Sequence, residues 1–494
     1  MAAGCLNATE QGIRRYNVTM VKHLAHFTLI LCLSLLASCS ERPLFDDLNA
    51  GDELIVLTRN SPTTYYFDND RETGFDYELI KAFADASGYK VRIKVAFTLE
   101  ELIHSLATGE AHLAAAGLTA TPERLERFYA SKPYLTQRPL VVYKSGLSRP
   151  RTIADLVNRD IIVLAGSSHS EALAGIAQNL PKLRWREIRA ADTLELMQLV
   201  AEEKADLAIV DSMEFRMQQR LYPRLVAAME LDDEAGMVWY LPKLPGAETL
   251  THRVNEFLET FKESGALKAL QDQHFGHTRA ASRIGSLTFQ QKIHSDLPKW
   301  QSLIETVAKD YRLDWRLLAA VSYQESHWNP KARSPTGVRG LMMITRATAQ
   351  DLGVDNRLDP EQSLRGGARF LKDLVRRLPD DIREPDRTWM ALAAYNIGMG
   401  HLEDARILTE RAGLDPHRWQ NVRSQLPALQ DPDVYPSTRF GFARGREAVT
   451  YVDNIRHYYA ALRLRELPNN RIQPPIDMGD LLAPEQTRVL PRAL

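Results

Sequence analysis

Cysteine is almost absent from this chain of 494 residues. Three cysteines occur, Cys5, Cys32 and Cys39, and none follows residue 39. The body of the protein therefore has no thiols for an internal disulfide framework or a cysteine-ligated metal site. We expect no metal and no cofactor.

An excess of charge of either sign is also lacking. Lys and Arg number 62 against 63 for Asp and Glu, so the formal net charge is −1. Such a chain has no overall field to attract a polyanion, and we expect no nucleic-acid partner. Hydrophobic residues make up 44% and charged residues 25%, as in folded globular proteins. A chain of this length exceeds what one core usually organises, which predicts two or more domains.

No apolar run is long enough to cross a bilayer comfortably, since a spanning helix needs roughly 20 residues. The run from Phe27 to Ala37 follows Lys22 and precedes small residues and Cys39. This is the layout of a secretory signal. The segment LASC, ending at Cys39, resembles the lipobox of bacterial lipoproteins, whose cysteine becomes the lipidated first residue. The alternative is a plain signal peptide with an incidental cysteine.

Ser40 after that cysteine resembles the outer-membrane sorting pattern. Residues 1–39 are accordingly predicted to be a leader and signal peptide. We expect the mature chain to be lipid-anchored at the periplasmic face of the outer membrane.

Between residues 50 and 275, short apolar strands alternate with helical stretches. Strands are predicted at 54–58, 91–97, 160–166 and 205–212, and helices at 77–87 and 99–108. This alternation is typical of α/β domains built from βαβ units. Two sets of such elements predict two α/β lobes.

Three segments of this region resemble the type 3, or amino-acid, family of periplasmic solute-binding proteins. They are GFDYELIKAFADASG at 74–88, AAAGLTATPERLERFYASKPYL at 114–135 and LAIVDS at 207–212. The resemblance implies a bilobal domain whose lobes close by hinge motion, and therefore a ligand that regulates or positions the attached domain.

The resemblance also implies ligand residues. Arg124 of the T-x-x-R segment would hold a ligand carboxylate, Asp211 would meet an ammonium group, and Thr119 would add a hydroxyl. The amides of residues 166–168 would lie at a helix start. A free amino acid or a muropeptide from the cell wall fits such a site. The competing interpretation is that Arg124 lies on a solvated helix face and Asp211 is an ordinary helix cap.

Beyond residue 277 the pattern is helical, with apolar residues at helical spacing in 298–311, 314–328, 361–378 and 387–396. Asp314 is a plausible N-cap of the second of these helices. Glu325 follows Val321 by four residues, which places its carboxylate on the apolar face. Burial there would raise its pKa and make it a general acid near neutral pH. A Glu that reaches solvent or pairs with Arg333 or His327 is the alternative.

Three motifs in this region resemble the lytic transglycosylases and goose-type lysozymes. They are QESHWNPKARSPTGVRGLMMIT at 324–345, ALAAYNIG at 391–398 and REAVTYVDNI at 446–455. Their order over roughly 170 residues makes the signal specific. The resemblance implies a mainly α, lysozyme-like domain with Glu325 as catalytic acid and base.

The same resemblance implies the substrate-binding residues. Ser334 would bond the substrate N-acetyl group or the acid, and Tyr451 would steady Glu325. Tyr395 and Asn396 would line the site. Met342 and Met343 would form an apolar wall beneath the sugar, although many relatives have Gln at the second position and both methionines could equally be core. Gly337, Gly340 and Gly398 are assigned to tight turns.

No second acid stands inside the three motifs, whereas hydrolytic glycosidases generally use two carboxylates. Asp355, Asp359 and Asp404 are candidates by position only. One acid suffices if the substrate supplies the nucleophile, which favours a lyase that cuts peptidoglycan glycan strands and leaves 1,6-anhydro-muramoyl ends. A muramidase that uses water remains the closest alternative.

The predicted organisation is a leader at 1–39, a solute-binding-like domain at 40–277, a lytic transglycosylase domain at 278–467 and a Pro-containing extended tail at 468–494. A receptor that only holds amino acids or wall fragments is the alternative from a different functional class. It predicts a dispensable Glu325, and the enzyme hypothesis predicts the reverse.

Overall fold

The computed structural model describes residue 45 and residues 48–69, 71–189, 192–276, 283–335 and 337–467. The predicted signal segment with Cys39 and the predicted tail from residue 468 lie outside these ranges. Within them, no helix combines the length and the apolar character needed to cross a membrane.

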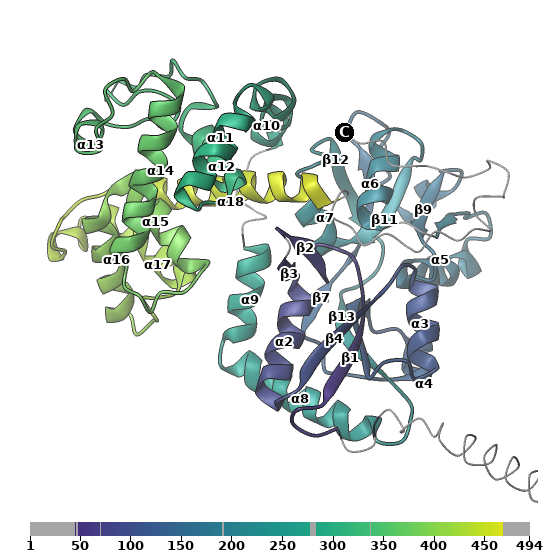
Figure 1. Cartoon of the computed structure of the whole chain (residues 1–494). Helices are drawn as coiled ribbons and strands as arrows, with labels where there is room; N and C mark the ends of the chain where they lie inside the picture. Colours follow the sequence, from purple (N-terminus) through teal and green to yellow (C-terminus); the bar gives the residue numbers. More distant parts are fainter. Residues whose placement is uncertain are drawn as a thin grey trace, which may run out of the picture. The chain divides into compact units, whose positions relative to one another are not determined.

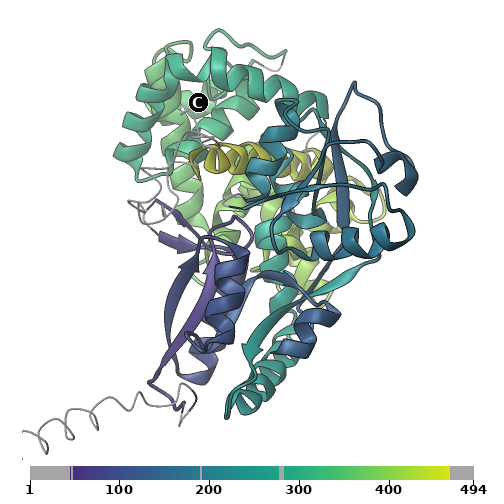
Figure 2. The same cartoon turned by 90° about the vertical axis from the view of Figure 1, so that its right-hand side faces the viewer.

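The first lobe of the α/β part is built on a sheet with strand order β4-β1-β5-β13-β6, and β7 also pairs with β13. Strands β1, β4 and β5 are parallel, and β13 runs antiparallel to β5. Helix α2 packs against β4 and β5. Figure 1 shows α2 beside β4, and Figure 2 shows the same chain turned by 90°. The bounds are β1 Glu53–Arg59, β2 Tyr66–Asp68, β3 Arg71–Thr73, α2 Phe75–Ser87, β4 Lys90–Ala96, α3 Leu99–Ala107, β5 Leu113–Thr119, α4 Pro122–Arg127, β6 Phe128–Ala130, β7 Leu135–Gln137 and β13 Ala235–Pro242.

The second lobe has a five-stranded sheet of order β10-β9-β11-β8-β12. Its central strands β9 and β11 are buried along their whole length, as their continuous apolar runs predict. The bounds are β8 Pro139–Lys144, η1 Ile153–Leu156, β9 Ile161–Leu164, α5 Ser168–Asn179, β10 Arg186–Ile188, α6 Thr193–Ala201, β11 Leu207–Asp211, α7 Ser212–Gln218 and β12 Leu225–Glu230. The predicted pair of α/β lobes is thus confirmed.

The chain returns from the second lobe to the first through β13, a strand that the sequence did not predict. Its residues are mostly buried, and Trp239 and Tyr240 are fully enclosed. In the chain, β13 comes after all five strands of the second lobe, and it joins the first sheet as the antiparallel neighbour of β5. Helices α8 Ala247–Glu263 and α9 Ala266–Phe275 follow.

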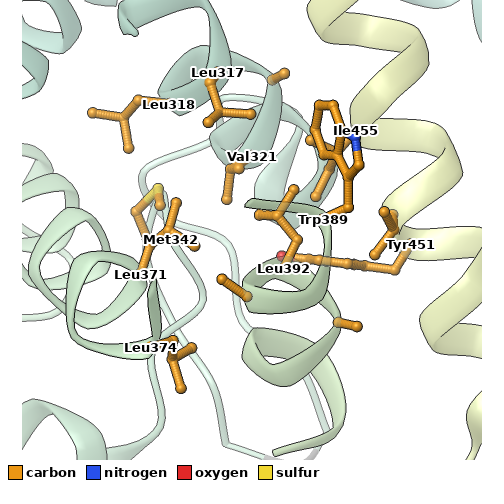
Figure 3. Close-up of a cluster of buried hydrophobic side chains, with 14 of the residues drawn as sticks. Leu317, Leu318, Val321, Met342, Leu371, Leu374, Trp389, Leu392, Tyr451 and Ile455 are labelled. Carbon is orange, nitrogen blue, oxygen red and sulfur yellow. The ribbon is translucent and has the colours of Figure 1, made fainter. Parts of the chain in front are cut away.

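The remaining described chain is helical, as predicted. One apolar core joins α11, α12, α14, α15 and α18, and Figure 3 shows side chains of α12, α14, α15 and α18 gathered in it. The bounds are α10 Arg283–Ser295, α11 Leu297–Tyr311, α12 Trp315–Ser326, α13 Arg346–Asp351, α14 Pro360–Arg377, α15 Asp386–Ile397, α16 Met399–Arg411, α17 Trp419–Gln425, η2 Leu426–Gln430, η3 Tyr435–Ser437 and α18 Gly445–Glu466.

Candidate active site

Glu325 lies in the last turn of α12, a helix whose start and end are both fixed locally. Asp314 caps its N-terminus by accepting the backbone N–H of Arg316 at 2.9 Å. The helix ends at His327, which takes the left-handed conformation with φ 52°. Leu318 and Val321 on the same helix are fully buried, so the apolar face is anchored in the core up to the turn that carries Glu325.

Glu325 opens onto a surface groove of about 450 Å³, called here the Glu325 groove. Its lining consists of Glu325, Ser326, His327, Asn329, Lys331, Ala332, Arg333 and Met343. Burial raises the pKa of Glu325 to about 7, and a hydrogen bond from Tyr451 opposes part of that rise. At neutral pH a large fraction of this carboxyl is therefore protonated, as a general acid requires.

Two tyrosines from other helices surround the acid. Tyr451 of α18 donates its hydroxyl proton to Glu325 Oε1 at 2.5 Å. Tyr395 of α15 donates to the backbone carbonyl of Met342 at 2.9 Å. Burial and then the charge of Glu325 raise the pKa of Tyr395 well above its usual value, so its hydroxyl stays a proton donor. The first sequence motif thus supplies the Glu325 carboxyl group, and the other two motifs each supply a tyrosine near it.

The two neighbouring methionines have different positions. Met342 is fully buried in the core, and its side chain fills the space that a side chain at Gly367 would occupy. Met343 has φ 44° and lines the Glu325 groove. The left-handed turn at Met343 is what turns its side chain away from the core that holds Met342. A sugar in the groove can therefore contact Met343, and the core interpretation holds for Met342.

The loop beneath the groove depends on a serine and a glycine. Ser326, next to the acid, donates its hydroxyl proton to the carbonyl of Leu341 at 2.9 Å and so ties α12 to the loop. At Gly340, φ is 85°, and an added Cβ would lie 1.8 Å from the carbonyl oxygen of Arg357. The predicted tight turn at Gly340 is confirmed.

Ser334 and Asn396 lie outside the lining of the groove. The backbone of Ser334 exchanges hydrogen bonds with Val338 and Gly337 and forms a turn. Asn396 is exposed near the end of α15. Ser326, which directly follows the acid in the first motif, is part of the lining.

Among the described residues that line the groove, Glu325 is the only carboxylate. Asp359 caps α14 by accepting the N–H of Gln362 at 2.9 Å. Asp404 is buried and accepts the N–H groups of Arg439 and Phe440. Asp355 is exposed. The structural roles of Asp359 and Asp404 agree with the expected single-acid site.

The three ligand residues predicted in the α/β part, Thr119, Arg124 and Asp211, lie between its lobes. We call this place the inter-lobe site, which also includes His169 and Glu171. Arg124 is 5% exposed although its neighbours on α4 face solvent, so the competing interpretation, an arginine on a solvated helix face, is wrong. Asp211 precedes α7 but makes no capping hydrogen bond. Ser167 caps α5, which confirms that residues 166–168 lead into a helix.

Two residues of this site, His169 and Glu171, were not found from the sequence. His169 Nε2 lies 2.9 Å from Asp211 Oδ1, and Glu171 Oε1 lies 3.3 Å from Arg124 Nη2. Both stand in the first turn of α5, directly after the predicted 166–168 segment. An acidic and a basic side chain at a helix start beside a predicted ligand site was the signal that could have found them.

Two protein-family descriptions match the chain. The family of bacterial extracellular solute-binding proteins, family 3, matches residues 54–277, and the transglycosylase SLT domain matches residues 302–413. Among solved structures, an arginine-binding protein mutant from T. maritima is 23% identical, with a TM-score of 0.41 over 45% of this chain and 95% of its own. An arginine-, lysine- and histidine-binding protein from Geobacillus stearothermophilus is also 23% identical, with a TM-score of 0.40 and the same coverage.

Curated relatives match both parts of the chain together. Membrane-bound lytic murein transglycosylase F of Saccharophagus degradans is 43% identical over 428 residues, which is 87% of this chain and 85% of the relative. The protein of the same name from Pseudomonas fluorescens is 44% identical over 430 residues, or 87% of this chain and 88% of the relative. The chain therefore belongs to the membrane-bound lytic murein transglycosylase F family.

Proposed function

We propose that the chain is a peptidoglycan lytic transglycosylase that cleaves the β-1,4 bond between MurNAc and GlcNAc and leaves 1,6-anhydro-MurNAc ends. It is a lyase that acts in remodelling and recycling of the cell wall. The observation that carries the proposal is one half-buried carboxyl, Glu325, with a pKa raised to about 7 in an open groove.

Glu325 acts first as an acid and then as a base. Its proton moves to the glycosidic oxygen as the bond to MurNAc C1 breaks, while the N-acetyl oxygen of the same sugar bonds to C1. The carboxylate that remains then takes the proton of the C6 hydroxyl, whose oxygen attacks C1 and releases the N-acetyl group. The acid ends protonated as it began, and no water is consumed.

The neighbouring residues hold the acid and the sugar. The hydroxyl of Tyr451 orients the Glu325 carboxyl and stabilises its ionised form during the second step. Met343 offers an apolar surface to a sugar ring in the groove. Tyr395 fixes the backbone of the methionine loop. Ser334 bonds the substrate N-acetyl group or the acid, and Asn396 lines the cleft.

The test is mass spectrometry of purified peptidoglycan digested by a soluble form that starts at Ser40. Glu325→Gln is run beside it, with Asp355→Asn as a matched control because Asp355 is exposed and does not line the groove. Anhydro-muramoyl products that vanish only with Glu325→Gln would support the lyase. Reducing muramic ends would indicate a muramidase, and undigested glycan with all three proteins would favour a receptor.

We further propose that acyl chains on Cys39 anchor the protein at the periplasmic face of the outer membrane. We separately propose that the solute-binding-like domain ends near residue 277 and that the transglycosylase domain begins near residue 278. Replacement of Cys39 by Ala should move the protein from the outer-membrane fraction to the soluble periplasmic fraction. Unchanged membrane fractionation would contradict the anchor.

We also propose that the inter-lobe site takes a ligand with a carboxylate and an ammonium group, such as a free amino acid or a muropeptide. The residue types at Arg124 and Asp211 support this proposal, because a guanidinium matches a carboxylate and a carboxylate matches an ammonium. Both side chains are nearly enclosed, which makes each charge count more than it would in water.

A further inference from the structure

Arg124, the residue expected to hold a ligand carboxylate, already has partners across the lobes. Its Nη2 donates to the backbone carbonyl of Gly166 at 2.9 Å and lies 3.3 Å from Glu171 Oε1. Arg124 belongs to α4 of the first lobe, whereas Gly166 and Glu171 flank the start of α5 in the second lobe. The carboxylate that faces the guanidinium is therefore one of the protein's own.

Asp211, the residue expected to meet an ammonium group, is likewise paired. His169 Nε2 lies 2.9 Å from its Oδ1, and both side chains are buried. Burial tends to raise the pKa of Asp211, but His169 and Arg59 outweigh that effect and hold the pKa below its usual value. Thr119 is occupied as well, because its hydroxyl accepts a hydrogen bond from Gln137 at 3.0 Å.

A second buried cluster connects the same two lobes. Glu214 of α7, which is 3% exposed, accepts hydrogen bonds from the hydroxyls of Ser61 and Thr63 at 3.0 and 2.9 Å. It also pairs with Arg59 at 3.2 Å and accepts the hydroxyl of Thr193. Ser61, Thr63 and Arg59 come from the first lobe. The lobes are thus held together by side-chain bonds at two places.

We propose that Glu171 and His169 act as internal competitors of the ligand, closing the inter-lobe site until a molecule with both a carboxylate and an ammonium group displaces them. The inference rests on the ligand part of the proposed function and adds how that ligand enters. A buried charge left without a partner is costly. An entering ligand must therefore replace both Glu171 and His169, because otherwise Arg124 or Asp211 would be buried without a partner of opposite charge.

The exposure of the two competitors sets the order of displacement. The side chain of Glu171 is 29% exposed, whereas that of Arg124 is 6% exposed. Because the Glu171 carboxylate already contacts water, it can rotate into solvent while the lobes stay together. Glu171 therefore leaves Arg124 first. The side chain of His169 is only 8% exposed, so its displacement requires the lobes to separate.

The first test uses hydrogen–deuterium exchange of the soluble chain without any ligand. Glu171→Ala, His169→Ala and the double variant are compared with wild type and with Gln178→Ala, an exposed control on the same helix. We expect the double variant to exchange several-fold faster in peptides covering 120–127 and 165–172, and the control to match wild type. Unchanged exchange in the double variant would overturn the inference.

The second test measures binding by calorimetry, with L-alanine, D-glutamate and meso-diaminopimelate as probes and uncharged N-acetyl-alanine methylamide as the negative control. We expect Glu171→Ala to bind at least one charged probe about tenfold more tightly than wild type. Equal affinity of both proteins would overturn the competition. Faster exchange without binding of any probe would overturn the ligand part of the proposed function, while the internal pairing would stand.

Discussion

The Glu325 groove and the inter-lobe site differ in how their charged side chains are partnered. In the groove, Glu325 has a hydrogen bond from a neutral tyrosine, and within the described part of the chain no cation forms an ion pair with it. In the inter-lobe site, Arg124 faces Glu171 and Asp211 faces His169. The pKa of the lone carboxyl rises to about 7, whereas that of the paired Asp211 falls.

This difference follows from what each place has to do. A proton donor must hold its proton at neutral pH, which requires burial without a nearby cation. A binding site only has to present its charges in a fixed arrangement, and internal partners can satisfy them until a ligand arrives. At these two sites, the carboxyl proposed to react has no ion pair, and the carboxylate proposed to bind ligand faces a histidine.

The largest expected effect is on the groove. Glu325→Gln keeps the size of the side chain but removes the proton that moves, so the rate of glycan cleavage should fall by roughly 10²–10⁴-fold. Turbidity loss of a peptidoglycan suspension measures the rate. Asp359→Asn, which changes a helix cap, should keep cleavage near the wild-type rate, and an equal loss in both variants would remove the distinction between them.

A smaller effect is expected from Tyr451→Phe. The tyrosine hydroxyl bonds to the Glu325 carboxyl and stabilises its ionised form, so its loss should raise the Glu325 pKa further above 7. Because the acid must be protonated, the alkaline limb of the pH–rate profile should move to higher pH, with a rate loss of about tenfold. A limb that moves to lower pH would contradict the assigned role of Tyr451.

The lone carboxyl should also cost stability in a defined pH window. Its pKa is about 7 in the folded chain against an ordinary 4.5, so the cost is absent below pH 4.5, grows as pH rises and is complete above pH 7. Glu325→Gln should therefore unfold at higher urea concentration than wild type at pH 8, by up to roughly 3 kcal/mol in the free energy of unfolding. At pH 4 the two proteins should unfold alike, and a difference of the same size there would contradict the assigned pKa.

The smallest effect is expected where the groove is lined by an uncharged side chain. Met343→Gln should raise KM about two- to threefold with kcat nearly unchanged, because the side chain contacts the sugar equally in the ground and transition states. Met342→Gln should instead destabilise the fold by roughly 1–3 kcal/mol, since it buries an amide without partners. Equal behaviour of the two variants would place both methionines in the same environment.

Local patterns were enough to place the acid but not its surroundings. The spacing from Val321 to Glu325 and the cap at Asp314 predicted helix α12 and the apolar face that ends at the acid. The hydroxyl of Tyr451, 126 residues away, could be expected only from the resemblance to lytic transglycosylases. Distant contacts of this kind depend on how helices pack, which periodicity does not encode.

The same limit explains the other differences. Met342 and Met343 are adjacent and chemically identical, and only the backbone turn at φ 44° decides which of them is exposed to the groove. Glu171 and His169 look like ordinary residues at the start of a helix until the second lobe brings Arg124 and Asp211 against them. Strand β13 was not predicted, because it pairs with β5 across more than a hundred residues.

The comparison between the two sites depends most directly on the protonation state of Glu325. Infrared difference spectra between wild type and Glu325→Gln, recorded from pH 5 to pH 9, report the C=O stretch of a protonated carboxyl that the variant lacks. We expect this band to persist at pH 6 and to titrate with a pKa of about 7. A band already absent at pH 6 would show an ordinary carboxylate and contradict its role as the acid.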